Sequence, residues 1–296
     1  MTGREKQNLK MGLAFTAPWI VGLVLFTLYP VGASFIYSFC DYSVLTKPVF
    51  IGLGNYVDLF TDEVYWHSVY NTFYYAAFLL PLSTLVALVL ALLLNADIRG
   101  KGVYRSIFFL PSIIPMISMA ILWLWIFNPK FGLLNYALAL FGIDGPSWLQ
   151  DPLWTKPAFI LMGVWTVGNA VVIYLAALQD VPPSLYEAAD IDGARWFHKI
   201  RHVTLPMISP AIFFNLVMGL ITALQVFAVP YVMTFPIPGQ PAGSALFYTM
   251  YLYDNAFRYL RMGYACAMAV VLFLLILGLT WLILRLSKRS VHYRGQ

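Results

Sequence analysis

Long apolar stretches separated by short polar segments dominate the chain. Six of these stretches have no Asp, Glu, Lys or Arg in their interior, and they cover residues 13–39, 69–94, 106–127, 157–178, 208–230 and 264–284. A helix needs roughly 20 mostly apolar residues to cross the hydrocarbon core of a bilayer. The pattern therefore predicts an all-α fold, a polytopic membrane bundle of about six transmembrane helices that forms one domain over residues 1–296.

Composition supports this fold class. The apolar share is 61% and the charged share is 10%, whereas soluble domains average about 45–50% and about 25%. Lipid must therefore be the solvent for much of the surface. Cys40 and Cys266 are too few for a disulfide framework, and both lie near the ends of apolar stretches, where we expect them to be small apolar fillers.

The positive charges predict the orientation. Thirteen of the eighteen Lys and Arg residues lie at the amino terminus, in the connections near residues 95–105 and 179–207, and at the carboxyl terminus. Lys and Arg gather on the cytoplasmic side of membrane proteins. We therefore expect both termini on the cytoplasmic side of the membrane. Because the charges adjoin the spans, they indicate topology and not a nucleic-acid partner.

An aromatic segment at residues 244–260 falls on the outer side of this topology. Tyrosine and tryptophan rings suit the headgroup region of a bilayer, so we expect an interfacial helix here and not a cage for a ligand. Its aromatic residues are Phe247, Tyr248, Tyr251, Tyr253, Phe257 and Tyr259.

Several kinds of chemistry leave no mark in the sequence. It contains no G-x-x-x-x-G-K-[ST] phosphate loop and no H-E-x-x-H motif, and its four histidines lie outside the apolar stretches. We therefore expect no catalytic residue, no metal site and no nucleotide bound by this chain. Proton- or sodium-coupled transporters and intramembrane enzymes normally carry ionisable residues inside their spans, so both classes are disfavoured.

One cytoplasmic connection, residues 179–207, is long and patterned. Ser184 and Glu187 form an S-x-x-E capping box, which predicts a helix over residues 185–192. Gly193 can take the left-handed conformation of a helix end. A second, amphipathic helix is expected over residues 194–202, and it should stop before Pro206.

Two short helices meeting at a glycine would suit docking to a cytoplasmic partner. A simpler interpretation also holds, because Glu187 can serve only as a cap and the nearby cations can serve only to mark the inner side. The spacing alone does not decide between a docking surface and these simpler roles.

The same loop resembles a family motif. Glu187-Ala188-Ala189, then Gly193, and after nine residues Val203-x-Leu205-Pro206 resemble the E-A-A-x₃-G-x₉-I-x-L-P motif of the membrane subunits of bacterial binding-protein-dependent ABC importers. Five further stretches are similar to the carbohydrate (maltose and glycerol-phosphate type) branch: residues 52–56, Asn71-Thr72, residues 105–115, residues 231–234 and residues 261–269.

The resemblance implies a transport complex in the plasma membrane of a bacterial cell. This permease would pair with a second permease subunit, two cytoplasmic ABC ATPase subunits would dock on the loop, and an extracytoplasmic binding protein would deliver a sugar. No cofactor would be bound here, since ATP would bind the partner subunits. The residues implied in ATPase coupling are Glu187, Ala188, Ala189, Asp192, Gly193, Leu205 and Pro206.

A sugar path must offer hydrogen bonds to hydroxyl groups. Asn215, Thr222 and Gln225 share one helix face at i, i+7 and i+10, and Trp165 and Asn169 are i, i+4 neighbours on the preceding span. We expect these residues either to contact substrate or to hydrogen-bond between helices, as polar groups in membrane bundles often do.

Overall fold

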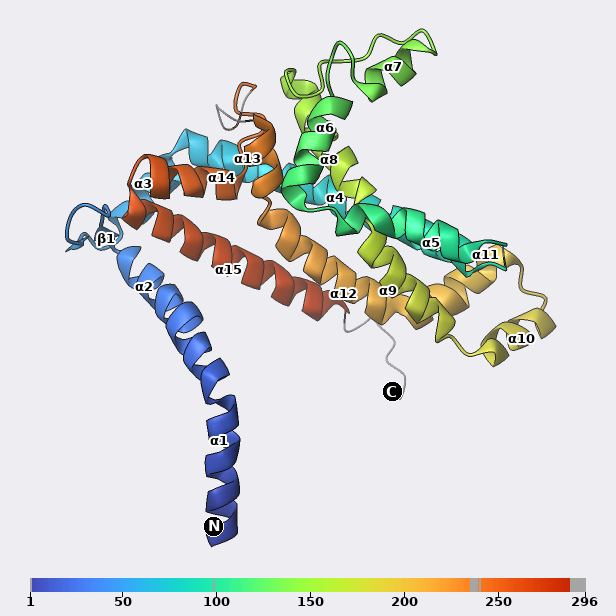
Figure 1. Ribbon diagram of the computed structural model, residues 1–296, viewed down its shortest axis with the longest axis horizontal. Coiled ribbons are helices and arrows are strands. Elements are labelled where there is room, and N and C mark those ends of the chain that lie inside the picture. Colours follow the sequence, from blue (N-terminus) through green and yellow to red (C-terminus); the bar gives the residue numbers. More distant parts are fainter. Residues whose placement is uncertain (1, 98, 235–238, 240, 288–296) are drawn as a thin grey trace. The chain divides into compact units, whose positions relative to one another are not determined.

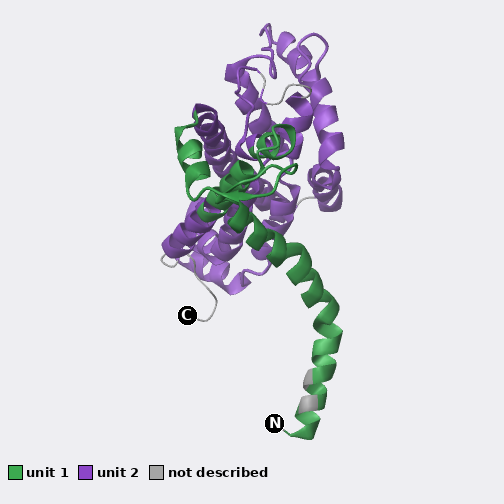
Figure 2. Cartoon of the chain, turned by 90° about the vertical axis from the view of Figure 1, so that its left-hand side faces the viewer, with its two compact units in different colours: residues 1–62, 252–274 green, residues 63–251, 275–296 purple. Residues whose placement is uncertain are grey.

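The computed structural model of the chain describes residues 2–97, 99–234, 239 and 241–287 (Figure 1). The described chain is helical apart from turns, loops and one two-stranded sheet. It divides into two compact units, residues 1–62 with 252–274 and residues 63–251 with 275–296 (Figure 2). The expectation of a single domain over residues 1–296 stays a prediction.

The first unit begins with a long apolar helical run and ends with the first half of the last span. A capping box between Thr2 and Glu5 opens the run, which explains why it begins before the predicted residue 13. Its elements are α1 (Gly3–Leu23), η1 (Val24–Leu28), α2 (Tyr29–Tyr37), β1 (Cys40–Asp41), β2 (Val49–Phe50), α3 (Gly54–Thr61), η4 (Asp254–Arg258) and the first half of α15 (Met262–Ser287).

Two of the segments that carry the family resemblance meet in this unit. Asn55 is buried and donates hydrogen bonds to the carbonyl oxygens of Ser38 at 2.9 Å and Cys40 at 2.8 Å. Gly263 lies so close that a Cβ there would stand 2.1 Å from the Cys40 carbonyl oxygen. Only glycine fits this position. The stretches at residues 52–56 and 261–269 therefore both pack against the backbone at Cys40.

The second unit holds the remaining elements. They are α4 (Glu63–Asn95), α5 (Lys101–Phe109), η2 (Leu110–Ile113), α6 (Met116–Ile126), α7 (Leu133–Ala139), α8 (Pro152–Trp165), α9 (Gly168–Gln179), α10 (Pro183–Ile191), α11 (Trp196–Lys199), η3 (Ile200–Thr204), α12 (Leu205–Leu224), α13 (Ala228–Thr234), α14 (Tyr248–Tyr253) and the second half of α15.

The described helices agree with about six crossings. Four are long and apolar enough to span a bilayer, namely Gly3–Tyr37, Glu63–Asn95, Trp196–Thr234 and Met262–Ser287. Two bent pairs, Lys101–Ile113 with Met116–Ile126 and Pro152–Trp165 with Gly168–Gln179, raise the number to six if each pair is one span. The fold is an all-α bundle whose long helices suit a membrane.

The third predicted span, residues 106–127, is not one straight helix. Its two halves meet at an angle of 101°. Pro115 has no backbone N–H to donate, and it holds Ile114 in the extended conformation, with φ −67° and ψ 129°. The helix therefore ends before the proline and restarts at Met116 in a new direction.

Helix α4 is the centre of the second unit and packs against α8, α9 and α12. Its N-terminal part carries the fully buried Asn71, whose amide donates to the carbonyl oxygens of Gly243 at 2.9 Å and Leu246 at 3.0 Å. Lys156 of α8 donates to the Asn71 side-chain oxygen at 3.1 Å. Asn71 thus ties the segment before α14 to α4 and α8, which satisfies all of its polar atoms inside the protein.

The expected interfacial aromatic segment is only partly at the surface. Phe247 and Tyr248 are buried, so the prediction is wrong for them. The Phe247 ring packs edge-on against Tyr75 and Phe159, and the Tyr248 N–H donates to the Thr72 hydroxyl at 2.9 Å. These two rings are therefore part of the core of the second unit, whereas Phe257 and Tyr259 are each 60% exposed.

Candidate functional site

A cavity of about 700 Å³ lies inside the second unit. Helices α4, α6, α8, α9, α12 and α13 surround it, and most of its wall is apolar. None of the described residues that line it is Asp, Glu, Lys, Arg or His. The cavity therefore offers a neutral environment in which amides, hydroxyls and aromatic rings are the available contacts.

Four of the five predicted path residues line this cavity together: Asn169, Asn215, Thr222 and Gln225. The fifth, Trp165, is not among the lining residues. Its ring packs edge-on against Trp123, with the ring centres 5.7 Å apart and the planes at 78°. Its neighbour at i+4, Asn169, lies beyond the 44° bend between α8 and α9, so the helical spacing predicted for this pair is interrupted.

The helix face predicted on the fifth span is interrupted at its C-terminal end. Helix α12 stops at Leu224, and Gln225 follows as its C-cap with φ −107° and ψ 17°. The i+10 position is therefore outside the helix, yet Gln225 still lines the cavity. The Thr249 hydroxyl donates to the carbonyl oxygen of Val226, which occupies one of the acceptors freed where the helix breaks.

The hydrogen bonds of the four lining residues show which of them bond to neighbouring residues. Asn215 donates to the Ala211 carbonyl oxygen at 3.1 Å and Thr222 to that of Met218 at 2.9 Å, so both bonds stay within α12. Among the described residues, Asn169 and Gln225 have no side-chain hydrogen bond. Among the described residues, none of the four side chains forms a hydrogen bond to another helix. Their remaining acceptor and donor atoms are therefore available inside the cavity.

Three further hydroxyls face the cavity, and the sequence analysis did not single them out. Ser83 and Thr84 belong to α4, and Thr166 lies between α8 and α9. Ser83 donates to the Leu80 carbonyl oxygen of its own helix at 3.1 Å, and Thr166, the C-cap of α8, donates to that of Gly163 at 2.8 Å. The signal was present, since adjacent hydroxyl residues interrupt an apolar stretch at 83–84.

The loop at residues 179–207 forms two helical segments on either side of Gly193, as predicted, but α10 begins differently. The capping box is wrong: the helix starts at Pro183, its N-cap is Pro182, and no side chain caps it. Proline suits the first helical turn because its missing N–H would be unpaired there in any case. The helix therefore begins two residues earlier than predicted, and Ser184 and Glu187 lie inside it.

The corner after α10 is the predicted left-handed glycine. Gly193 has φ +71°, the Gly193 N–H donates to the Asp190 carbonyl oxygen at 3.0 Å, and the Ala194 N–H donates to that of Ala189 at 2.9 Å. These are the two hydrogen bonds of a Schellman motif, which satisfies carbonyl groups left free at the helix end. The motif turns the chain sharply between α10 and α11.

The second helix of the loop does not stop before Pro206. Helix α11 continues through the π-helical segment η3 directly into α12, so that residues 196–234 run as one candidate span (Figure 1). The Leu205 N–H donates to the Ile200 carbonyl oxygen, an i→i−5 bond. Proline is tolerated because it falls in the first turn of α12, where the wider π turn already relaxes the backbone.

The predicted coupling residues separate into two sets. Glu187, Ala188, Asp192 and Gly193 are exposed, and Ala189 is half-buried. Leu205 and Pro206 are half-buried at the root of α12, and Leu205 packs against the core cluster that contains Leu178, Val181 and Ile208. The first set can therefore contact a partner, while the second fixes the loop to the bundle.

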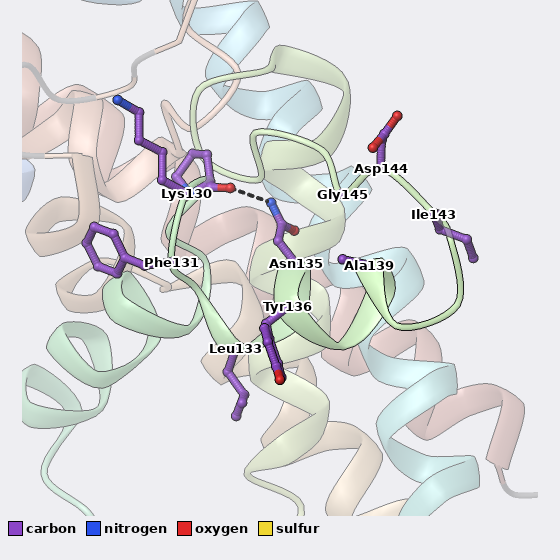
Figure 3. Close-up of a pocket in the computed structure, with 10 residues that line it drawn as sticks. Lys130, Phe131, Leu133, Asn135, Tyr136, Ala139, Ile143, Asp144 and Gly145 are labelled. Carbon is purple, nitrogen blue, oxygen red and sulfur yellow. Dashed lines mark hydrogen bonds between the residues drawn. The ribbon is translucent and has the colours of Figure 1, made fainter.

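A second pocket, of about 600 Å³, lies around α7 in the segment that the charge distribution places outside (Figure 3). Asn135 shapes it by donating to the carbonyl oxygens of Pro129 at 3.1 Å and Pro146 at 3.2 Å and accepting from the Trp148 ring N–H at 2.7 Å. The rings of Phe131 and Tyr136 line it and are mostly exposed. Nothing in the sequence analysis pointed to this pocket.

Solved structures share this architecture over nearly the whole chain. The chain superposes with a TM-score of 0.84 and 26% identity, over 97% of this chain and 96% of the other, on a chain in the crystal structure of a bacterial alginate ABC transporter in complex with its alginate pentasaccharide-bound periplasmic protein. The chain also superposes on a chain of a bacterial ABC transporter involved in the import of alginate, with a TM-score of 0.82 and 26% identity over 98% of this chain and 100% of the other.

Relatives at the sequence level are permease proteins. The probable ABC transporter permease protein YesP of Bacillus subtilis is 41% identical over 99% of this chain and 94% of its own length. The trehalose/maltose transport system permease protein MalF of Thermococcus litoralis is 31% identical over 95% of each chain. Residues 80–292 match the family described as binding-protein-dependent transport system inner membrane component. This chain belongs to that family, whose members are multi-pass subunits of the inner membrane and work in transport complexes.

Proposed function

We propose that this chain forms half of the translocation pathway of an ATP-driven sugar importer and that the cavity of the second unit is its share of the path. The observation that carries the proposal is an uncharged wall on which the Asn169 and Gln225 amides have no hydrogen bond among the described residues, while Asn215 and Thr222 keep free acceptor atoms. Sugars present hydroxyl groups that need hydrogen-bond partners when they leave water. Phe214 and Phe227 supply apolar faces for the ring carbons in the same cavity.

The names of the relatives support the substrate class. Trehalose and maltose, lactose, sulfoquinovosyl glycerol and sn-glycerol-3-phosphate appear among the systems to which similar permeases belong. These compounds share several hydroxyl groups and differ in charge and size. The common feature matches the hydrogen-bonding groups of the cavity.

The partners follow from what the chain lacks. Its sequence has no phosphate loop and its relatives are ABC transporter permeases, which supports an energy supply from separate ATPase subunits. We place two such subunits at the exposed face of α10, a second permease subunit beside this one in the membrane, and a sugar-binding protein on the outer side. Both termini lie in the cytoplasm in this arrangement, and the chain itself catalyses no reaction.

Substitutions in the cavity test the proposal. We expect Thr222→Val and Asn215→Leu each to lower sugar uptake by the reconstituted complex about three- to ten-fold, since each removes one hydrogen bond to the sugar. The matched control is Thr16→Val, because the Thr16 hydroxyl also donates to a carbonyl of its own helix, that of Gly12 at 3.0 Å, but lines no described cavity. Uptake is measured with labelled sugar at several concentrations.

The control and both cavity variants should assemble with the partner subunits and bind ATP normally. If the two cavity variants transport as fast as the wild type, the cavity is not on the sugar path. If Thr16→Val lowers uptake as strongly, the effect belongs to membrane packing and also counts against the proposal.

A further inference from the structure

Helix α10 has two faces with different surroundings. Glu187, Ala188 and Ile191 lie on one face and are exposed, with Ile191 88% exposed. Tyr186 and Asp190, an i, i+4 pair on another face, bond to residues beyond the corner. The helix therefore offers one face to a partner while the other is tied to the chain that leads into the membrane.

The two ties differ in strength. Asp190 forms an ion pair with Lys199, but its carboxylate side chain is 64% exposed. Exposed ion pairs contribute little, because water and salt screen them and two long side chains must be ordered. Tyr186 lies 3.0 Å from the Thr204 hydroxyl, and Thr204 is only 3% exposed. The hydroxyl pair is therefore the stronger of the two connections.

The direction of this hydrogen bond follows from the other bonds of Thr204. Its hydroxyl donates to the Lys199 carbonyl oxygen at 3.3 Å. A hydroxyl has a single proton to donate, so the Tyr186 O–H donates to the Thr204 oxygen. The Tyr186 ring in turn packs against the core cluster that contains Leu178, Val181 and Ile208. Both ends of the bond are thus held by packing.

Thr204 is the last residue before α12, the helix that carries Asn215 and Thr222 into the cavity. A displacement of α10 therefore has two routes to the cavity wall: the backbone around Gly193, and the direct bond from Tyr186 to Thr204. We infer that the Tyr186–Thr204 hydrogen bond is a positioning link that makes α10 and α12 move together. This inference rests on the proposed function, since it describes how the coupling loop would pass a motion from the ATPase to the path.

The link can be broken without removing a ring or a branched side chain. Tyr186→Phe and Thr204→Val each keep the shape and delete the bond. We expect both to lower the number of sugar molecules imported per ATP hydrolysed about five-fold, while basal ATP hydrolysis and subunit assembly stay at wild-type levels. The expected size is that of one hydrogen bond. Measurement uses the full complex in proteoliposomes, with uptake and phosphate release recorded together.

Three controls make the outcome specific. Thr204→Ser keeps the acceptor and should retain wild-type coupling. Tyr104 is an exposed residue of α5 whose hydroxyl has no hydrogen bond among the described residues, so Tyr104→Phe should have no effect. The double variant Tyr186→Phe with Thr204→Val should be no worse than either single variant, because both act on one bond.

Unchanged coupling in Tyr186→Phe, or equal losses in Thr204→Ser and Thr204→Val, would overturn the link alone. Failure of the wild-type chain to associate with an ATPase, or to stimulate it, would instead contradict the proposed function. The two failures are therefore distinguishable in the same set of experiments.

Discussion

Replacing Gly193 by valine is expected to lower sugar-stimulated ATP hydrolysis by the reconstituted complex at least ten-fold. Gly193 has φ +71°, and no atom outside its neighbours lies within 4 Å of a Cβ placed there. The cost is therefore conformational and not steric: the left-handed region costs an L-residue about 1–2 kcal/mol, and β-branched residues avoid it most strongly. The valine variant would have to open the Schellman turn and redirect α10.

The matched variant is Gly193→Asn, because asparagine adopts the left-handed conformation more readily than other residues with a Cβ. It should keep at least half of the wild-type activity. In both variants the separate binding protein should retain its sugar affinity, which is measured by thermal shift. Full stimulation in Gly193→Val would show that the corner plays no part in coupling.

The second large effect is expected at Gly168, the first residue of α9. A Cβ there would stand 2.6 Å from the Phe108 carbonyl oxygen and 3.0 Å from the Phe109 Cα. Both are backbone atoms of α5, which cannot move aside as a flexible side chain can. We expect Gly168→Ala to destabilise the fold by about 1–3 kcal/mol, the usual cost of overpacking.

Melting of the purified chain in detergent measures this effect. Gly278→Ala is the control, since nothing lies within 4 Å of a Cβ at that position of α15. The Gly168 variant should melt several degrees below the wild type and the Gly278 variant within error of it. Equal melting temperatures for the wild type and Gly168→Ala would show that α5 and α9 do not pack as described.

Some features of the fold follow from local sequence because each has a local cause. The apolar stretches are long enough to require a membrane, and the left-handed corner at Gly193 needs a glycine regardless of what surrounds it. The polar residues on the fourth and fifth spans were recognisable for the same reason, since an amide in an apolar helix needs a partner.

Other features depend on which surfaces meet, and the sequence does not state this. Proline ended a helix at Pro115 but not at Pro206, because the latter falls in the first turn of α12 after a π turn. The rings at Phe247 and Tyr248 have the composition of a headgroup segment, yet Tyr75 and Thr72 bring them into the core.

In the candidate site, too, some residues could be predicted from local sequence and others depend on how the helices pack. Four of the five predicted path residues line one cavity, whereas Trp165 packs against Trp123 and is separated from Asn169 by the bend between α8 and α9. Ser83 and Thr84 on α4 complete the polar wall, and their place there depends on the packing of α4 against α9 and α12. Helical spacing within one span could not predict that neighbour.

In the proposed function, ATP hydrolysis on partner subunits drives transport through this chain. The most direct test of this claim is sugar uptake into proteoliposomes that hold the complete complex and internal ATP, with and without a protonophore. The described spans carry no buried carboxylate relay within the cavity wall, and the sequence has no phosphate loop. We therefore expect uptake to stop when ATP is omitted and to continue when the proton gradient is collapsed. Loss of uptake on adding the protonophore, while internal ATP remains high, would contradict this account and favour an ion-coupled transporter.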